Sequence, residues 1–440
     1  MPTIKKLLLA ASDVALLFFA LAVTLFIRYP RNLFFDRLED HALPFSAIFL
    51  IWLFVFYLAD LYRQKSFRTQ SIIASELTLA TAISAIASVV LFYLFGPFFE
   101  LAPKTNLLIF TTVFFLESYL WRTFLGAVFR SGRTPVVVIG NSPRIEETAR
   151  YLEENLHAGY RFAGWIKNAS PDELKKIPAL VKESGARTIV VQPKLSEKSD
   201  IVHAIYSMSP FETAVISFSD FYELILDRVP LDEIKDGWVI EHIAMRRPFY
   251  DAAKRLLDIL LGLIIGIILS PIALLVTLGI KIDSRGPALF IQERFGKNGK
   301  LFPLYKFRTM KMEGHKDNWP LWTEENDPRI TSLGKLLRLT HADEVPQLWN
   351  IIKGDISFTG PRPERSELAK KYQDIPYYDI RHVVKPGLTG WAQINYKPSS
   401  SLEEARAKLE YDIYYVKNRS FVLDLLIIIR TIRYIFVTNK

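Results

Sequence analysis

The sequence predicts a membrane protein in three parts. A four-helix membrane unit comes first, a parallel α/β domain of Rossmann type follows, and a second α/β domain carries a re-entrant membrane helix. Three observations indicate this fold class: four apolar segments of spanning length fill the first 130 residues, strands and helices then alternate, and a later apolar run is interrupted by proline at its centre. We expect the domains to cover 1–130, 131–247 and 248–440.

Composition limits the class of protein and of site. The chain has 440 residues, is 50% hydrophobic, carries a net charge of +9 and contains no cysteine. An apolar yet basic chain suits a membrane protein whose soluble parts face anionic lipids or anionic substrates. The absence of cysteine excludes disulfides, thiolate zinc sites and cysteine nucleophiles. We expect no nucleic-acid partner.

The N-terminal unit is predicted from four apolar segments, at about 7–27, 42–61, 72–95 and 105–129. Glu117 and Arg122 interrupt the last of them. These two side chains could pair with each other, or Arg122 could extend to the interface and leave 105–121 as the apolar span.

Basic residues predict the orientation of this unit. One side carries Lys5, Lys6, Arg63, Lys65, Arg68, Arg122, Arg130 and Arg133. The other side carries Arg28, Arg31, Arg37 and Lys104, diluted by Asp36, Glu39, Asp40 and Glu100. The positive-inside rule therefore places both ends of the unit in the cytoplasm.

Alternating strands and helices predict the parallel sheet of the middle domain. The strands are expected at 135–140, 161–166, 187–191 and 214–218, and the helices at 143–156, 174–184 and 201–208. The first turn has one glycine, Gly140, where a dinucleotide-binding fingerprint needs three. We therefore expect a Rossmann-like shape with a structural or regulatory role.

The apolar run 259–280 predicts a membrane helix of unusual form. Lys254 and Arg255 precede it, Lys281 and Arg285 follow it, and Ser270-Pro271 sits at its centre. Basic flanks favour keeping both ends in the cytoplasm, and proline removes a helical hydrogen bond. We expect a re-entrant helix, about 254–282, that breaks at Ser270-Pro271; the alternative is a kinked fifth span. The tail, 421–437, is apolar but charged in places and predicts an interfacial helix.

Two adjacent carboxylates, Asp343 and Glu344, precede a helix that Pro346 can open and that would end near Gly354. Buried carboxylates need a metal, a cation or water. The free N–H groups of the helix would lie beside them and suit a phosphate. The alternative is that the two acids only cap the helix.

Basic residues of the kind that phosphate chemistry uses surround this pair in the sequence. Lys306 and Arg308 alternate with apolar residues as in an amphipathic strand. Arg338 lies five residues before Asp343, and Arg362 stands between two prolines that restrict its backbone. These four are our candidates for binding substrate phosphates.

Residues from about 250 to 440 resemble the bacterial polyprenyl-phosphate glycosylphosphotransferases, the monotopic phosphoglycosyl transferases. The resemblance rests on motifs in one order: Lys254-Arg255-x-x-Asp258, Ser270-Pro271, Ser284-x-Gly286-Pro287, Gln292-x-Arg294-x-Gly296, Tyr305-Lys306-Phe307-Arg308-Thr309-Met310, Asp343-Glu344-x-Pro346-Gln347-Leu348-x-Asn350, Lys353-Gly354-Asp355, Gly360-Pro361-Arg362-Pro363 and Lys385-Pro386-Gly387-Leu388-Thr389-Gly390-Trp391-Ala392-Gln393. The four-span start and α/β middle look like the large members of the family. Ala342 and Thr359 depart from the usual pattern without replacing a functional position.

The resemblance implies transfer of sugar-1-phosphate from a UDP-sugar to undecaprenyl phosphate, with release of UMP. It implies that Asp343 is the nucleophile, that Glu344 is the Mg²⁺ ligand, and that Arg338 and Arg362 hold phosphate oxygens. Ser270-Pro271 would form the turn of the re-entrant helix, which Lys254, Arg255 and Asp258 would help to fix at the interface.

The family serves exopolysaccharide and O-antigen (lipopolysaccharide) assembly at the bacterial inner membrane, so we expect that location and membrane lipid as a partner. A homodimer through the Rossmann-like domain is expected by analogy alone. The sequence leaves open the sugar and the pathway.

Two other functions compete. A membrane-tethered sugar-nucleotide dehydratase or epimerase would use a Tyr-x-x-x-Lys pair, and Tyr250 and Lys254 have that spacing. That enzyme also needs a glycine-rich loop, which the first turn lacks. An inactive membrane scaffold is the other alternative, and the intact acidic pair argues against it.

Overall fold

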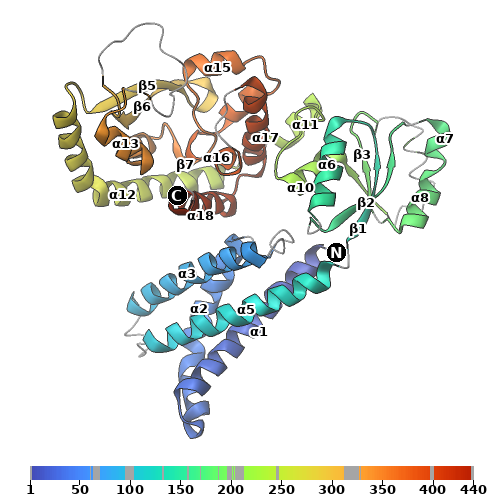
Figure 1. The fold of residues 1–440 in the computed structure, drawn as a ribbon, viewed down its shortest axis with the longest axis horizontal. Coiled ribbons are helices and arrows are strands. Elements are labelled where there is room, and N and C mark those ends of the chain that lie inside the picture. The colour runs from blue at the N-terminus through green and yellow to red at the C-terminus, as the bar shows by residue number, and fades with distance from the viewer. Residues whose placement is uncertain are drawn as a thin grey trace. The chain divides into compact units, whose positions relative to one another are not determined.

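The computed structural model describes residues 2–437 except 60, 63–69, 95–103, 131–132, 156–157, 169, 187, 196–200, 202, 204–212, 244–246, 312–326, 328 and 397–400. The chain forms two compact units, Met1–Phe221 and Tyr222–Lys440. Figure 1 shows a group of long helices, a domain with a sheet, and a mixed α/β domain near the C-terminus.

The predicted N-terminal segments are helical: α1 (Pro2–Arg28), α2 (Phe34–Leu58, after the short helix η1, Arg31–Leu33), α3 (Gln70–Leu94) and α5 (Lys104–Arg130). Among the described residues of this unit, three stretches are long and apolar enough to cross a membrane, namely Leu9–Arg28, Arg31–Tyr57 and Thr105–Leu125. In α3 the described apolar stretch is shorter, Ala80–Tyr93. The predicted orientation partly depends on Arg63, Lys65, Arg68 and Glu100, which lie outside the described residues.

A buried aromatic cluster holds these helices together. Phe45 and Trp52 of α2 contact Phe110 of α5, with ring centroids 5.4 and 5.2 Å from Phe110. All three side chains are at most 1% exposed. Such edge-on aromatic pairs add to the packing of a helical bundle. Outward-facing positions stay apolar, as Leu50 and Leu108 show with about 70% exposure (71% and 69%).

The charged residues that interrupt α5 interact in neither of the two ways that the sequence predicted. Arg122 neither pairs with Glu117 nor extends outward; it forms a buried ion pair with Asp13 of α1, with Nη2 and Oδ2 2.6 Å apart. Both side chains are at most 1% exposed. A charged side chain inside an apolar helical bundle costs free energy unless it is paired. The partner of Arg122 lies on another helix.

The middle domain has the predicted parallel sheet. Its elements are β1 (Thr134–Ile139), α6 (Pro143–Glu154), β2 (Tyr160–Ile166), α7 (Pro171–Leu174), α8 (Ile177–Ser184), β3 (Thr188–Val191), β4 (Ala214–Ser217) and α10 (Phe218–Leu226). The predicted helix at 201–208 lies almost entirely outside the described residues. The strand order is β2-β1-β3-β4, with every neighbour parallel. This order begins the flavodoxin-like winding rather than the Rossmann order 3-2-1-4.

The C-terminal unit begins at Tyr222, within α10, whereas the sequence led us to expect a boundary at 248. Val229, Leu231 and Ile243 are buried in one cluster with Leu409 and Ile413. The helix α11 (Asp236–Ile243) precedes the membrane helix. The apolar face of this segment is therefore covered by the C-terminal unit.

The rest of the C-terminal unit consists of the long helix α12, the helices α17 and α18, and shorter elements around two small sheets. They are α12 (Pro248–Asp283), β5 (Leu289–Phe295), η4 (Lys297–Gly299), β6 (Leu301–Phe307), α13 (Ser332–Leu339), η5 (Ala342–Glu344), α14 (Gln347–Lys353), β7 (Ser357–Thr359), α15 (Ser366–Tyr372), η6 (Tyr378–Val383), β8 (Gly387–Thr389), α16 (Trp391–Asn395), α17 (Leu402–Asn418) and α18 (Phe421–Val437). β5 and β6 form an antiparallel hairpin, and β7 and β8 pair in parallel.

The helix α12 is continuous through Ser270 and Pro271, where the sequence predicted a break. Its ribbon nevertheless turns sharply partway along its length (Figure 1). Ser270 Oγ donates to Ile267 O over 2.8 Å. Proline cannot donate to the preceding turn, and a bend is the usual result. The whole helix meets the length and apolarity of a membrane span.

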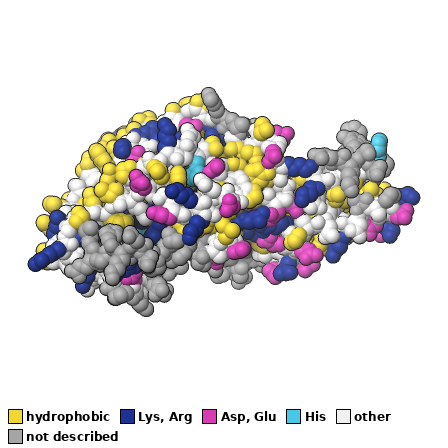
Figure 2. All heavy atoms as spheres, turned by 90° about the horizontal axis from the view of Figure 1, so that it is seen from above, with side chains coloured by type: hydrophobic (Ala, Val, Ile, Leu, Met, Phe, Trp, Pro, Cys, Tyr) yellow, Lys and Arg dark blue, Asp and Glu magenta, His cyan; other side chains and the backbone are white. Residues whose placement is uncertain are grey.

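Both arms of α12 pack on the same C-terminal unit. Ile265 and Leu269 of the first arm contact the cluster of Leu348 and Ile351. On the second arm, Ile280 is buried with Leu337 of α13. The opposite face is exposed and apolar: Ile267 and Leu275 are 72% and 67% exposed. Figure 2 shows such hydrophobic side chains at the surface among the charged ones. Large exposed apolar faces mark contact with a membrane or a partner.

The C-terminal helix α18 forms as predicted and packs one face into the C-terminal unit. Leu423, Leu426 and Ile427 are buried in the cluster that also holds Leu409. Asp424, on the same face, is 7% exposed. An interfacial position for the other face stays a prediction.

Candidate active site

Asp343 and Glu344 lie in the single helical turn η5, between α13 and α14. His341, with φ 54°, reverses the chain after α13 in the left-handed conformation. Pro346 is the N-cap of α14, and Gly354, with φ 98°, ends it. The helix predicted between these two residues is thus confirmed. A left-handed residue after a helix is most often glycine because it has no Cβ.

Two cations converge on one oxygen of Glu344. Lys306 Nζ of β6 and Arg362 Nη2 donate to Glu344 Oε1 over 2.6 and 3.0 Å. Lys306 Nζ also lies 4.0 Å from Asp343 Oδ2. Residues 306, 343, 344 and 362, predicted from separate motifs, therefore form one cluster. We call these four residues the acidic cluster.

The two carboxyls differ electrostatically. Burial alone would raise the pKa of Glu344, but Arg362 and Lys306 together hold it at about 2. Burial raises the pKa of Asp343; Lys306 lowers it and the neighbouring Glu344 raises it further. Paired acids with pKa values pushed apart by their surroundings usually have separate roles in a reaction. We call Glu344, which two cations hold, the clamped carboxylate. Asp343 is the less neutralised carboxylate of the pair.

Arg338 lies at the edge of this arrangement. Its Nε donates to Thr309 Oγ1 over 2.9 Å. Burial lowers the pKa of Arg338, and the charges of Asp343 and Asp327 raise it. Arg338, in the last turn of α13, therefore interacts electrostatically with Asp343 without a direct contact between the two side chains among the described interactions.

Arg308 does not join the cluster. Its guanidinium donates to Arg285 O and Ser284 O, each over 2.7 Å, and to Ser284 Oγ over 2.9 Å. The residue is 5% exposed. Carbonyl oxygens of the turn after α12 occupy the donors that we expected to bind phosphate. Arg308 therefore ties β6 to the end of the membrane helix.

Buried charged side chains form hydrogen bonds to the backbone at Arg362 and Pro363 and fix its position. Arg381 Nη2 donates to Arg362 O over 2.8 Å and lies 2.9 Å from Asp412 Oδ2. Arg294 Nη1 donates to Pro363 O over 2.9 Å. Lys408 pairs with Glu364 over 2.6 Å. Sequence reasoning missed Arg381, Asp412, Glu364 and Lys408, because nothing local in the sequence connects residues so far apart.

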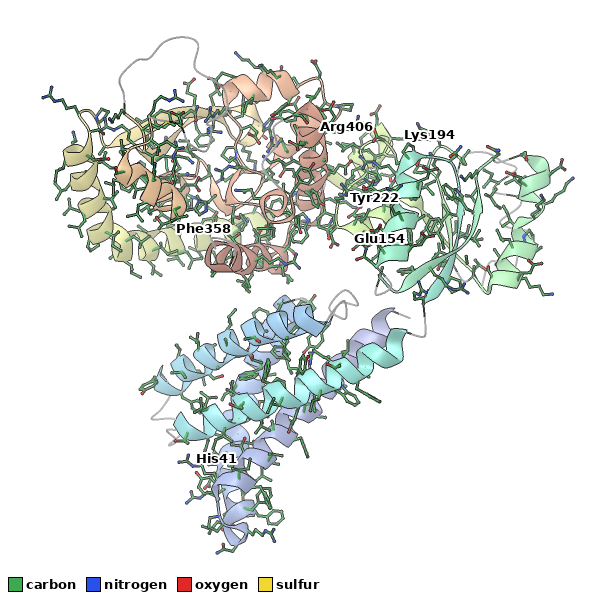
Figure 3. All side chains as sticks on the ribbon, in the orientation of Figure 1. His41, Glu154, Lys194, Tyr222, Phe358 and Arg406 are labelled. Atoms are coloured by element: carbon green, nitrogen blue, oxygen red, sulfur yellow. The ribbon has the colours of Figure 1, made fainter. Side chains whose placement is uncertain are left out.

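The first turns of α12 are locked to the same unit. Arg255 donates to Ile351 O and Ile352 O of α14, each over 2.6 Å. Asp258 Oδ1 accepts from Ser357 Oγ over 3.0 Å and from the N–H of Phe358, labelled in Figure 3, over 3.2 Å. Both residues fix the membrane helix by bonds to protein, next to the helix that follows the acidic pair.

Lys254 belongs to a buried network around Asp424 of α18. Lys254 Nζ lies 2.6 Å from Asp424 Oδ2, which also accepts from Tyr250 OH over 2.6 Å. Tyr415 OH donates to Asp424 Oδ1 over 2.8 Å. The Tyr250–Lys254 pair thus has a structural partner, and nothing in these contacts supports a dehydratase site. In the sequence, the only indication of a role for Asp424 is that it is a charge in an apolar helix.

The donor set suits Mg²⁺ only with help from a substrate. Within the described residues there is no group of three or more His, Cys, Asp or Glu side chains that could hold a metal ion. Mg²⁺ commonly takes one or two carboxylates and completes its shell with waters and substrate phosphates. Asp343 and Glu344 supply two adjacent carboxylates, so they fit such an ion bound together with a diphosphate.

Comparison with known proteins gives a consistent family. Residues 249–438 match the family model of the bacterial sugar transferases. The chain is 42% identical over 185 residues to the exopolysaccharide production protein PSS of Rhizobium leguminosarum bv. phaseoli, covering 41% of this chain and 92% of that protein.

Longer relatives are also similar. The UDP-N-acetylgalactosamine-undecaprenyl-phosphate N-acetylgalactosaminephosphotransferase of Aeromonas hydrophila is 37% identical over 212 residues, which is 48% of this chain and 49% of that one. The UDP-glucose:undecaprenyl-phosphate glucose-1-phosphate transferase of Escherichia coli (strain K12) is 30% identical over 280 residues, or 61% and 59%. The matches cover only 49% and 59% of the length of these two longer relatives. From these matches, and from the motifs that form the acidic cluster, the chain belongs to the bacterial sugar transferase family.

Proposed function

We propose that this chain transfers sugar-1-phosphate from a UDP-sugar to undecaprenyl phosphate and releases UMP. The observation that carries the proposal is the acidic cluster beside a membrane helix: one clamped carboxylate, one less neutralised carboxylate, and the cations Lys306 and Arg362 between them. Phosphoryl transfer depends mainly on positioning and charge neutralisation, and these are the groups that supply both. The names of the relatives point to the same substrates.

In this proposal Asp343 is the nucleophile. A carboxylate oxygen of Asp343 attacks the phosphorus next to the sugar, and the bond from that phosphorus to the bridging oxygen breaks. UMP leaves with that oxygen. A phosphate oxygen of undecaprenyl phosphate then attacks the same phosphorus and frees the Asp343 carboxylate. A covalent intermediate divides one difficult step into two and suits substrates that arrive from different phases.

The cations have distinct tasks in these steps. Lys306 and Arg362, held near Asp343 by Glu344, would face the diphosphate oxygens when it binds. Arg338 would neutralise charge on the other side of Asp343. A guanidinium binds phosphate oxygens in a forked geometry, whereas an ammonium acts as a point charge.

We propose Mg²⁺ as the cofactor, held by Glu344 with Asp343 beside it. When bound, the ion would offset negative charge on the diphosphate during transfer. Glu344 Oε2 makes no hydrogen bond to the described part of the chain, so one oxygen of the clamped carboxylate remains available to an ion. Lys306 and Arg362 would stay on Oε1 or turn to the substrate.

The membrane arrangement follows from α12. We propose that α12 enters the bilayer, bends near Ser270-Pro271 and returns, with the active site on the cytoplasmic face of a bacterial inner membrane. Support comes from both arms packing on one unit and from the basic residues at both ends. The acidic cluster would then lie at the depth of a lipid phosphate.

The pathway proposed is the first step of exopolysaccharide or O-antigen synthesis, in line with the exopolysaccharide relative. The parallel α/β domain would serve a structural or regulatory role and offer a surface for a homodimer.

The reaction is tested by the nucleotide that it releases. Membranes containing the chain, undecaprenyl phosphate and Mg²⁺ should release UMP from one member of a panel of UDP-sugars. Release of UDP would instead indicate an ordinary glycosyltransferase and contradict the proposal. The panel also identifies the sugar.

The nucleophile is tested separately. Asp343→Asn should abolish UMP release while the folded protein is recovered at the same level. Without acceptor lipid, the unsubstituted chain should gain the mass of one phosphosugar, and Asp343→Asn should gain none. Near-normal turnover by the variant would remove Asp343 from this role.

A further inference from the structure

A cavity of about 580 Å³ lies at the start of α12, and none of its lining residues belongs to the acidic cluster. The first turns of α12, β7, the segment 383–385 and η4 contribute to its wall, all within the C-terminal unit. Its size is in the usual range for small-molecule sites, about 300–1,000 Å³. We call it the α12 pocket.

The wall of the α12 pocket is strongly basic. It carries five basic side chains, Lys254, Arg255, Lys297, Lys385 and Arg419, but only two acidic ones, Asp251 and Asp258. Asp258 already accepts two hydrogen bonds from β7, and Asp251 lies 3.8 Å from Arg419. The acids of the wall are therefore engaged. Asp424, behind the wall, offsets the charge of Lys254, and the other basic side chains leave the pocket an excess of positive charge.

Lys385 is a basic residue of the wall whose charge no acidic side chain contacts directly in the described part of the chain. Its half-buried side chain forms no hydrogen bond or ion pair with the described part of the chain. Burial lowers the pKa of Lys385 and the like charges of Arg255 and Lys297 lower it further, and the charges of Asp258 and Asp355 offset this only in part. Its backbone is fixed by neighbours: Pro386 O accepts from Ser357 N over 2.9 Å, and Gly387 N donates to Pro361 O over 3.0 Å. The chain thus holds an ammonium group close to other cations, and a bound anion would relieve their repulsion.

The wall also has an apolar part, which continues onto the membrane helix. Ile243, Pro248, Val383 and Val384 form this part, and Asn298, Ser357 and Thr359 add uncharged polar groups. The next turns of α12 expose Leu256 and Leu260, which are 59% and 47% exposed, within the stretch that could cross a membrane. A ligand with an anionic head and an apolar tail matches both surfaces.

We propose that the α12 pocket binds the phosphate headgroup of an anionic membrane lipid, at a site separate from the acidic cluster. Lys385 would face the phosphate, Lys297 would approach it from the rim, and the acyl chains would lie along α12. A soluble phosphate shares the headgroup chemistry, so the experiment must separate the two sources. The inference concerns binding alone and does not depend on the reaction proposed above.

The test measures stabilisation of the purified full-length chain in neutral detergent. A ligand that binds the folded state and not the unfolded state raises the unfolding temperature, and the shift grows with the ratio of ligand concentration to Kd. The probes are phosphatidylglycerol in mixed micelles, phosphatidylcholine in the same micelles, and inorganic phosphate. We expect phosphatidylglycerol to raise the unfolding temperature of the unsubstituted chain well above the effect of the other two probes.

Matched variants assign the effect to the pocket. Lys297→Ala/Lys385→Ala should lose at least half of the phosphatidylglycerol shift. Lys370→Ala/Lys371→Ala removes two charges from exposed positions on α15, outside the pocket, and should keep the shift. Lys385→Arg preserves the charge and should also keep it. Single Lys297→Ala, at an exposed position, gives a smaller loss and serves if the double variant does not fold.

Each outcome decides the proposal. A phosphatidylglycerol shift that falls only in the Lys297/Lys385 variants supports it. An equal shift with inorganic phosphate assigns the pocket to a soluble anion and overturns the lipid as ligand. Equal loss in both double variants, or no shift at all, means that general charge and not the pocket binds the lipid, and overturns the proposal.

Discussion

Asp343 and Glu344 are neighbours in sequence, yet nearby cations neutralise them to different degrees. Glu344 Oε1 receives both Lys306 and Arg362, whereas Lys306 is 4.0 Å from Asp343 Oδ2. A carboxylate already bound by two cations is a poor nucleophile, because its charge is neutralised where it would attack. The geometry therefore favours Asp343 for attack and Glu344 for holding cations, a choice that sequence spacing left open.

Lys306 links the two acids, and its removal should change the pH dependence of the reaction. Lys306 lowers the pKa of Asp343 and of Glu344. Without Lys306 both pKa values rise, so the two carboxyls stay ionised over a narrower range of pH. In Lys306→Met we expect the acid limb of the kcat/KM profile to move to higher pH. We also expect the rate to fall by about 10²–10³, the usual loss on removing one preorganised charge-stabilising group.

The control for this variant is Lys300→Met, a change of the same kind at an exposed position just before β6. Its pH profile should match that of the unsubstituted chain. If Lys306→Met lowers the rate without moving the acid limb, then Lys306 does not act through the two carboxyls.

At the scale of elements, the loop that carries Arg362 depends on the contact between η6 and α17. Arg381 and Asp412 form its buried ion pair, with exposures of 4% and 1%, and Arg381 also donates to Arg362 O. Removing one partner of a buried pair leaves the other charge uncompensated. This pair therefore supports both the stability of the unit and the position of the Arg362 guanidinium.

Arg381→Met should destabilise the C-terminal unit by about 3–5 kcal/mol, the typical cost of breaking a buried ion pair. The unfolding temperature of the purified chain would fall, and UMP release would fall with it because Arg362 loses its support. The double variant Arg381→Met/Asp412→Leu leaves no lone charge and should recover part of the unfolding temperature. A double variant less stable than Arg381→Met would show that the two residues do not act as a pair.

Elements with local signals were predictable from the sequence. Val136 to Ile139 form a buried apolar run, and β1 is a central strand of the sheet. Pro346 and Gly354 mark the ends of α14. The strand order was not predictable, because a βα repeat is compatible with more than one winding of a parallel sheet.

The sequence also did not predict which distant side chains pair with one another. The pairs Arg122–Asp13 and Lys254–Asp424 join residues 109 and 170 positions apart. Arg308 sits in a motif next to Lys306, yet it turns to the carbonyl groups of residues 284 and 285. The alternation of side chains along a strand predicts the face of the sheet to which each side chain points. It does not predict which hydrogen-bond acceptor lies on that face. Of the site, the residue types were therefore predictable and their contacts were not.

For the whole molecule, the central question is whether α12 crosses the membrane or returns. The length of the helix, Pro248–Asp283, permits a crossing. The packing of both arms on one unit opposes it, because a soluble unit cannot lie on both sides of a bilayer. Lys281 and Arg285 at the far end also favour the cytoplasmic side.

The lack of cysteine makes this question directly testable, since any introduced thiol is the only one in the chain. Ala252→Cys and Arg285→Cys place a thiol at exposed positions on either side of the membrane run, and Arg31→Cys places one in the connection between α1 and α2. In intact cells, a maleimide that cannot cross the inner membrane should label only Arg31→Cys. After permeabilisation all three should react. Labelling of Arg285→Cys in intact cells would mean that α12 spans the bilayer, and the acidic cluster could then not be held at the cytoplasmic face by both arms of the helix.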